Sequence, residues 1–223
     1  MRTLNKEIQQ KITPAEALTI LKEGNRRFVQ NLKLNRNLLE QVNNTSDGQW
    51  PFAVILSCID SRTSAELIFD QGLGDIFSVR IAGNVVNEDI LGSMEFACKV
   101  AGSKFIVVLG HNKCGAVKGA CDHVKMGNLT ALLSKIEPAI NEETTTKENR
   151  SSSNSEFVEN VAHINVTRNV HEIMDRSEIL REMIESGQIG VIGAMYDVTS
   201  GEVEFYEDTL ISGKVKERQM QTA

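Results

Sequence analysis

The sequence predicts an α/β fold in which helices flank a central, mostly parallel sheet. Two short apolar runs, at about residues 52–57 and 105–109, have no alternating polar residues, which is typical of strands buried on both faces of a parallel sheet. Helical patterns lie between the strand-like segments and favour right-handed crossover connections. Further along, the segment 188–198 is followed by the turn Thr199-Ser200-Gly201 and a run at 202–206, which predicts an antiparallel edge strand.

The first strand is expected in the middle of the sheet, with the second strand, at about 76–81, and the third strand on either side of it. The strand order is then 2-1-3-4, followed by the antiparallel edge strand. In this order the carboxyl ends of strands one and three are neighbours. Helices are expected at about 64–69, 88–101, 114–126, 129–140, 157–174 and 177–187.

The N-terminal part predicts a helical arm at about residues 13–31. Thr13-Pro14-Ala15-Glu16 is a capping box with proline at the first helical position. The helix that follows carries Leu18, Leu21 and Phe28 along one side. An amphipathic helix of this kind typically packs on its own core.

Length and composition indicate one domain over residues 1–223, with 41% hydrophobic and 24% charged residues. Within it, residues 32–48 predict an irregular connection, 141–155 a polar surface loop, and the last residues a frayed end. A net charge of −6 without a basic cluster argues against a nucleic-acid partner. No apolar run approaches the length of a membrane span. The N-terminus lacks a signal-peptide core and the four cysteines suggest no disulfide framework, so a cytoplasmic location is expected.

Three potential metal ligands fall where the first and third strands end. Cys58 follows the first strand, and His111 and Cys114 follow the third. Neighbouring strands are only about 4.8 Å apart, and parallel sheets place ligands beyond the carboxyl ends of their strands, so these side chains can meet. Zinc favours thiolate and imidazole, and a catalytic zinc site keeps a fourth position for water. The sequence therefore predicts one Zn²⁺ per subunit, bound by Cys58, His111 and Cys114.

Cysteine residues are not always metal ligands. Free cysteines are often small buried hydrophobic residues, and this is our interpretation of Cys98 and Cys121. Cys58 and Cys114 instead lie beside polar or glycine-rich turns at strand ends. A redox pair would require a C-x-x-C motif, which the sequence lacks. Nucleotide binding is disfavoured because no G-x-G-x-x-G or Walker pattern follows a strand.

These motifs together resemble the β-class carbonic anhydrases. Cys58-x-Asp60-x-Arg62 followed by His111-x-x-Cys114-Gly115 is a specific combination at this separation, and the resemblance covers roughly residues 13–207. It implies a carbonate dehydratase, a zinc lyase in which zinc-bound hydroxide attacks carbon dioxide to give bicarbonate and a proton. The resemblance extends through Phe77-Ser78-Val79-Arg80-Ile81-Ala82-Gly83-Asn84 and Gly92-Ser93-Met94-Glu95-Phe96-Ala97.

Asp60 and Arg62 are expected to act as a gating and orienting pair at the metal. Asp60 could accept the hydroxide proton or, in a closed form, become a metal ligand itself. Arg62 is placed for a bidentate pair that holds this carboxylate away from the metal. A simple ion pair in a strand-to-helix turn, or Asp60 as a helix N-cap, is the alternative. A subset of the family closes the site with bicarbonate and carries tryptophan three residues before the first cysteine; Ile55 occupies that position here, so we predict the open form.

The resemblance also implies a substrate pocket of mostly hydrocarbon character. By motif position its residues are Phe77, Ala82, Phe96 and Gly115, and Gln49 matches a glutamine whose amide orients the substrate. Core packing is the alternative role for Ala82 and Phe96. In the family, N-terminal helices commonly wrap the partner subunit, which is the alternative for the helix at 13–31. The glutamine and the aromatic residues typically act across a dimer interface, so we expect a homodimer or tetramer with the active site near that interface.

Three functions remain open from the sequence alone. The same ligands could support carbon dioxide hydration or hydrolysis of carbon disulfide or carbonyl sulfide, and zinc could also have only a structural role. Asp60, Arg62 and Gln49 argue against a structural role, because a structural site needs none of them. His123 and His163 are possible proton shuttles, although ordinary surface or core histidines are the more common case.

Overall fold

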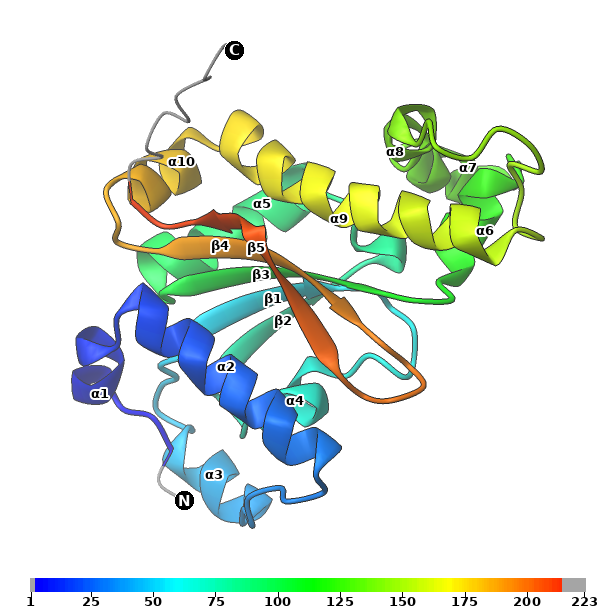
Figure 1. Cartoon of the computed structure of the whole chain (residues 1–223). Helices are drawn as coiled ribbons and strands as arrows, with labels where there is room; N and C mark the ends of the chain where they lie inside the picture. The colour runs from blue at the N-terminus through cyan, green and yellow to red at the C-terminus, as the bar shows by residue number, and fades with distance from the viewer. Residues whose placement is uncertain (1–2, 214–223) are drawn as a thin grey trace, which may run out of the picture.

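Figure 1 shows the computed structural model of the chain, which describes residues 3–213. A five-stranded sheet has the order β2-β1-β3-β4-β5; β4 and β5 pair antiparallel, and the other neighbouring pairs are parallel. The predicted fold class and strand order are therefore confirmed. The strands are β1 (Ala53–Ser57), β2 (Ile76–Arg80), β3 (Phe105–His111), β4 (Gly190–Tyr196) and β5 (Val203–Ile211).

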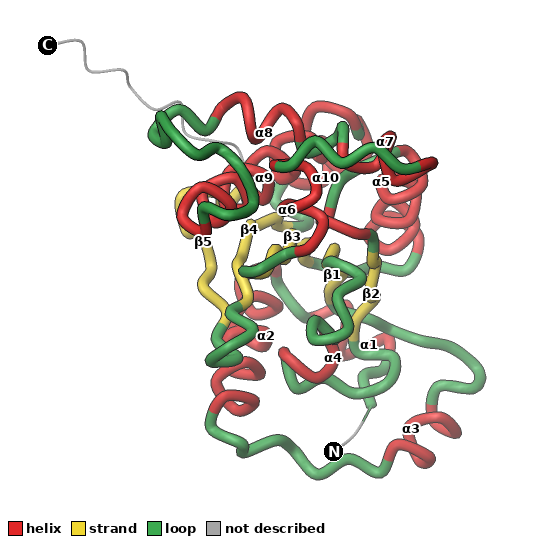
Figure 2. Tube along the Cα trace, turned by 90° about the vertical axis from the view of Figure 1, so that its right-hand side faces the viewer, coloured by secondary structure: helices red, strands yellow, loops and turns green. Residues whose placement is uncertain are grey.

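Helices cover both faces of the sheet (Figures 1 and 2). Helices α1 to α4 lie on one side, and α5 to α10 lie on the other, where α9 is the longest and crosses the sheet (Figure 1). The helices are α1 (Lys6–Lys11), α2 (Pro14–Val29), α3 (Leu38–Asn44), α4 (Ala65–Ile68), η1 (Ala82–Asn84), α5 (Glu88–Glu95), η2 (Phe96–Val100), α6 (Gly115–Cys121), α7 (Gly127–Leu133), α8 (Glu137–Glu142), α9 (Ser155–Arg176) and α10 (Glu178–Glu185).

The burial of the strands explains their sequence patterns. Every residue of β1, β3 and β4 is buried, because each of these strands has helices on both faces. Within β1, Val54 and Leu56 belong to the core under α9, whereas Ala53 and Ile55 belong to the core under α2. The edge strands β2 and β5 instead mix buried and exposed positions. Continuous apolar runs thus mark the central strands, and alternation marks the edges.

The N-terminal helix α2 forms as the capping box predicts. Thr13 accepts a hydrogen bond from the Glu16 backbone N–H, and the Glu16 carboxylate accepts one from the Thr13 N–H. Leu18 and Leu21 are buried in the same core as Ala53 and Ile55 of β1. Of the two arrangements left open, α2 therefore packs on its own sheet. Gly24 permits a close approach here, because a Cβ at that position would lie 1.8 Å from the Phe69 carbonyl oxygen.

The sequence prediction missed two short helices, α1 and α3. Both consist mainly of polar residues and show no clear apolar period, so their stability comes from caps and tertiary hydrogen bonds. Gln9 of α1 donates to the carbonyls of Pro51 and Ala101, and Gln41 of α3 accepts from the Leu73 N–H. Asn37 caps α3 inside the segment expected to be irregular.

Two predicted helix boundaries were also wrong. The helix after Cys114 ends at Cys121 instead of about Met126. Shortly after Cys121, His123 adopts a left-handed conformation with φ 52°, which does not continue the helix. The single helix expected over 129–140 is two helices, α7 and α8, and Pro138 lies in the first turn of the second one. The apolar period continued across these breaks and therefore hid them.

The polar segment 141–155 lies at the surface and is fastened by one buried carboxylate. Glu143 accepts hydrogen bonds from the Thr146 N–H, at 3.0 Å, and from Arg150, at 2.6 Å. The Arg150 guanidinium lies 4.6 Å from the ring centroid of Phe157 at the start of α9.

No helix in the described part of the chain combines the length and the apolar character needed to cross a bilayer. The frayed end predicted for the last residues lies largely outside the described residues.

Candidate metal centre and active site

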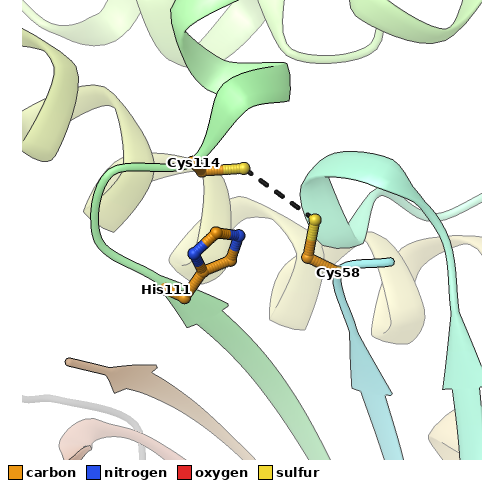
Figure 3. Close-up of side chains that lie close together, drawn as sticks. All are labelled: Cys58, His111 and Cys114. Carbon is orange, nitrogen blue, oxygen red and sulfur yellow. Dashed lines mark hydrogen bonds between the residues drawn. The ribbon is translucent and has the colours of Figure 1, made fainter. Parts of the chain in front are cut away.

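Cys58, His111 and Cys114 meet at the carboxyl ends of β1 and β3 (Figure 3). Cys58 directly follows β1, His111 is the last residue of β3, and Cys114 is the N-cap of α6. Their ligand atoms all lie within 4.8 Å of one another, and all three residues are buried. The predicted convergence is therefore present, and it arises because β1 and β3 are parallel neighbours.

The ring of His111 is oriented by the residue that follows it. Its Nδ1 lies 2.8 Å from the Asn112 carbonyl oxygen, so in the neutral ring Nδ1 carries the proton and donates it. The Nε2 atom of His111 is then a free acceptor, and it is buried without a hydrogen-bond partner in the described structure. An orphaned buried nitrogen facing two thiols is the arrangement expected of a metal ligand.

The two thiols have opposite pKa shifts. The neighbouring Cys114 thiol, whose Sγ lies 4.0 Å away, lowers the pKa of Cys58, and His111 and the Gly83 N–H lower it further. The same contact, together with burial, raises the pKa of Cys114. The pair by itself thus favours a single thiolate. A divalent cation between the sulfurs would stabilise the second thiolate, as in a metal site.

The donor set fits zinc. Two thiolates and one imidazole are ligands that Zn²⁺ favours, and three protein ligands leave one coordination position for water or substrate. The buried, unpartnered Nε2 of His111 supplies the observation specific to this structure. The chain therefore has the residues to hold the zinc ion that its sequence predicts.

Asp60 lies beside this cluster and is paired with Arg62. The guanidinium donates from Nε to Oδ1 at 2.9 Å and from its terminal nitrogen to Oδ2 at 2.8 Å, and the Arg62 backbone N–H also donates to Oδ1. These contacts hold the pKa of Asp60 well below its usual range. Oδ2 is 4.0 Å from His111 Nε2. Asp60 is therefore an ionised carboxylate that lies close to the ligands but is directed towards arginine.

Cys58 of this cluster lines a cavity of about 280 Å³. Ala82 and Gly115, two of the residues expected in the substrate pocket, also line it, as does Asp60. The sequence prediction missed the remaining lining residues, which come mainly from α6 and α7. The positions in α6 are small and one turn apart, which is the signal that could have identified them. The missed residues are Ile59, Ala116, Gly119, Leu129 and Leu133.

The other predicted pocket residues lie elsewhere on this subunit. Phe77 and Phe96 have ring centroids 6.2 Å apart and line a separate surface groove of about 780 Å³ beside the edge strand β2. The side chain of Phe96 is 53% exposed. Gln49 is exposed just before β1. A role for these three residues in the site thus requires a second subunit and stays a prediction.

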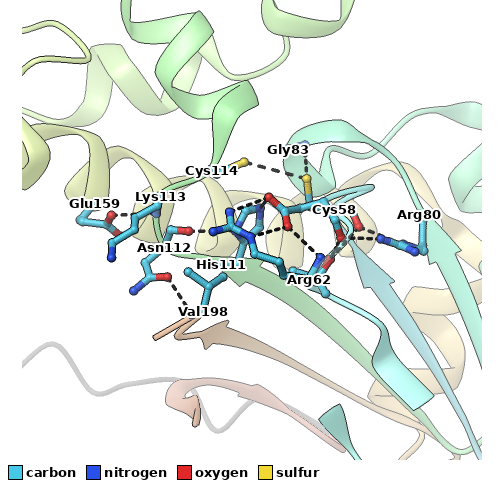
Figure 4. A network of polar contacts seen from close by, with 12 residues as sticks. Cys58, Arg62, Arg80, Gly83, His111, Asn112, Lys113, Cys114, Glu159 and Val198 are labelled. Carbon is cyan, nitrogen blue, oxygen red and sulfur yellow. Dashed lines mark hydrogen bonds and ion pairs between the residues drawn. The ribbon is translucent and has the colours of Figure 1, made fainter. Parts of the chain in front are cut away.

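Backbone contacts that the sequence did not reveal hold the loops of the cluster (Figure 4). Arg80 donates to the carbonyl oxygens of Cys58, at 3.0 Å, and Asp60, at 2.7 Å. On the other side, the Glu159 carboxylate accepts from the N–H of Lys113, a residue at φ 55° between His111 and Cys114. These contacts fix the two ligand-bearing turns from outside the cluster.

The two histidines considered as proton shuttles do not line the cavity at the metal centre. His163 lies on α9 and stacks on the ring of Tyr206, with centroids 5.1 Å apart. His123 is exposed in the connection between α6 and α7.

Fold and site together define an α/β protein with a mostly parallel sheet and a buried Cys–His–Cys cluster, suited to a metal ion, at the ends of two neighbouring strands. The sequence model of the carbonic anhydrase family matches residues 53–203. Carbonic anhydrase 2 of Mycobacterium tuberculosis is 36% identical over 198 residues, which span 84% of this chain and 90% of that protein. The chain therefore belongs to the carbonic anhydrase family, in its β class.

Solved structures show the same fold. Coccomyxa β-carbonic anhydrase, in complex with acetazolamide, superposes with a TM-score of 0.70 at 23% identity and covers 88% of each chain. A tetrameric β-carbonic anhydrase from Sordaria macrospora gives a TM-score of 0.65 at 23% identity, covering 75% of this chain and 90% of its own.

Proposed function

We propose that this chain catalyses the reversible hydration of carbon dioxide to bicarbonate and a proton, with Zn²⁺ held by Cys58, His111 and Cys114. One observation carries the proposal: Cys58 of the buried ligand cluster lines a cavity whose walls are mostly hydrocarbon and which contains one ionised carboxylate, Asp60. A small apolar substrate fits hydrocarbon walls, and a reacting water molecule needs a nearby polar group.

Bound zinc would supply Lewis acidity, which lowers the pKa of water from about 15.7 towards 7. The protein balances its charge, because two thiolates and a neutral imidazole give a site with a net charge near zero. The Nδ1–H of His111 is held on the Asn112 carbonyl, which keeps Nε2 available as the ligand atom. The chain's own contribution is thus a fixed, nearly neutral set of donors.

Asp60 would orient the attacking water by accepting a hydrogen bond at Oδ2. Arg62 keeps this carboxylate ionised and directed away from the ligands, and the low pKa of Asp60 means that it stays an acceptor at neutral pH. Ile55 lies buried in β1 where a tryptophan would accompany bicarbonate-controlled closure. The open arrangement, with Asp60 on Arg62, is therefore the one we propose near neutral pH.

Walls of the cavity would receive carbon dioxide. Ala82 and Gly115 leave space beside Cys58, and Leu129 and Leu133 close the apolar side. Gly115 has no atoms near the position of a Cβ, so its small size keeps the cavity open next to the cluster.

Assembly into a homodimer or tetramer would complete the site. The edge strand β2 pairs only with β1 in the described chain, and the groove with Phe77 and the exposed Phe96 lies beside it. A partner subunit on this edge would cover that groove and could bring its own Gln49 towards the cavity. The Sordaria macrospora relative is described as tetrameric.

All four cysteines are free, which supports the cytoplasm as the compartment.

Stopped-flow measurement of carbon dioxide hydration by the zinc-loaded protein tests this proposal. We expect activity in the parent, loss of activity together with zinc in Cys58→Ser, and loss of about 100-fold with zinc retained in Asp60→Asn. Cys121→Ser, outside the cluster, is the matched control and should stay active. Hydrolysis of carbonyl sulfide without hydration of carbon dioxide, or a zinc-loaded protein that is inactive with both, would contradict the proposal.

A further inference from the structure

The turn that follows β2 directs one backbone N–H at a metal ligand. The Gly83 nitrogen lies 3.4 Å from Cys58 Sγ and donates to it (Figure 4). This geometry depends on two successive residues in the left-handed region, Gly83 at φ 70° and Asn84 at φ 44°. A non-glycine residue adopts this conformation at a cost, so the turn needs support from its surroundings.

Two buried asparagines of α9 supply that support. Asn165 Nδ2 donates to the Gly83 carbonyl oxygen at 3.0 Å. Asn169 Oδ1 accepts the Val86 N–H at 3.0 Å, so the two side chains hold the turn at both ends. Only 2% of Asn165 and 6% of Asn169 is exposed.

Asn169 also fixes the direction of Asn165. Its Nδ2 donates to the Asn165 backbone oxygen at 2.7 Å and to Asn165 Oδ1 at 3.2 Å. Because Oδ1 is thereby used as an acceptor, the amide NH₂ of Asn165 faces the turn. The chain of contacts therefore runs from Asn169 through Asn165 and Gly83 to the sulfur of Cys58.

We propose that Asn165 and Asn169 are positioning residues for the metal centre, which hold the Gly83 N–H on the Cys58 sulfur and thereby set the affinity for zinc. An N–H that donates to a thiolate sulfur stabilises the anionic ligand and fixes its direction towards the metal. Loss of the Asn165 amide would leave the Gly83 carbonyl buried without a donor, and the turn would relax away from Cys58. This inference rests on the proposed zinc site and adds the residues that orient it.

The test compares Asn165→Leu and Asn169→Leu with Val170→Ala. Val170 is buried in the same helix, so its truncation weakens the core, but its side chain cannot hydrogen-bond the turn. Zinc affinity is measured by competition with a chromophoric chelator, at a temperature where circular dichroism shows each protein folded. The cobalt-substituted proteins are compared by their thiolate-to-cobalt charge-transfer absorption.

We expect both leucine variants to bind zinc about 10- to 100-fold more weakly, with an altered charge-transfer band, while Val170→Ala keeps the parent affinity. Parent-like affinity in folded Asn165→Leu, or an equal loss in Val170→Ala, would overturn the inference. If the leucine variants do not fold, the test is made on the parent protein by NMR. In its cadmium-substituted form, the Gly83 amide proton should show scalar coupling to the metal nucleus. Absence of this coupling overturns the inference. A parent that binds no zinc would refute the proposed function, whereas equal binding by parent and variants refutes only this inference.

Discussion

Removal of the metal should lower the melting temperature of the protein by about 8 to 16 °C. The three ligands are already assembled in the fold, with all ligand atoms within 4.8 Å of one another, so zinc binds the folded state selectively. At a free zinc concentration of about one thousand times Kd, selective binding adds about 4 kcal/mol to the free energy of unfolding. For a chain of this length, each kcal/mol shifts the melting temperature by about 2–4 °C.

Differential scanning calorimetry measures this shift between a zinc buffer of fixed free concentration and an excess of chelator. Cys58→Ala should abolish the shift because it removes a ligand. Cys98→Ala is the matched control, because Cys98 is equally buried but lies outside the cluster. Burial raises the pKa of its thiol to about 12, so the thiol stays protonated. This control can lower the melting temperature itself through a small cavity, but its zinc-dependent shift should equal that of the parent.

Two results would refute the reasoning. One is a zinc-dependent shift in the parent below about 3 °C under saturating zinc, which would mean that the cluster contributes little binding energy to the folded state. The other is loss of the shift in Cys98→Ala, which would place the metal away from Cys58.

Two further predictions concern the cavity and the polar loop. Gly119→Leu should fill the cavity and lower kcat/KM for carbon dioxide by about tenfold or more, while the zinc-dependent shift of the melting temperature persists. Gly119→Ala is the control: its added Cβ would lie 3.4 Å from Leu133, so this variant should stay active. Parent-like kinetics in Gly119→Leu would show that the substrate does not use this cavity. Burial opposes ionisation of Glu143, but hydrogen bonds from Thr145 and its neighbours, together with Arg150, hold the pKa of Glu143 at about 2 instead of 4.5. The contribution of ionised Glu143 to stability should therefore be complete above pH 4.5 and vanish towards pH 2. In urea unfolding of the metal-free proteins, Glu143→Gln should be less stable than the parent at pH 7 and equal to it near pH 2. A difference in unfolding free energy that does not change with pH would contradict this.

The central strands could be predicted because burial on both faces leaves a local signal. β1 and β3 are apolar at nearly every position, and the ligands follow directly where these runs stop. Parallel pairing then brings Cys58 and His111 together although they are far apart in the chain. The short helices α1 and α3 leave no such signal, because contacts made by Gln9 and Gln41 with distant backbone groups stabilise them.

The cavity shows the same division. Ala82 and Gly115 could be expected near the ligands because they lie in recognisable motifs beside them. Leu129 and Leu133 could not, because the predicted helix over 129–140 is in fact broken, and only the packing of α7 against α6 directs these side chains into the cavity. Gln49 and the aromatic pair of the surface groove remain predictions that a single subunit does not test.

By itself the sequence indicated the chemical groups of the candidate site: two thiols, an imidazole and an Asp60–Arg62 pair, all at or just beyond the ends of two strands whose burial is evident from their composition. Tertiary structure decided how these groups are held. The N–H of Gly83 on the Cys58 sulfur, and the asparagines of α9 behind it, depend on a helix more than eighty residues away in the chain. Residue identities and local periods are properties of the sequence, whereas the direction of a backbone N–H depends on which distant side chains pack against its turn.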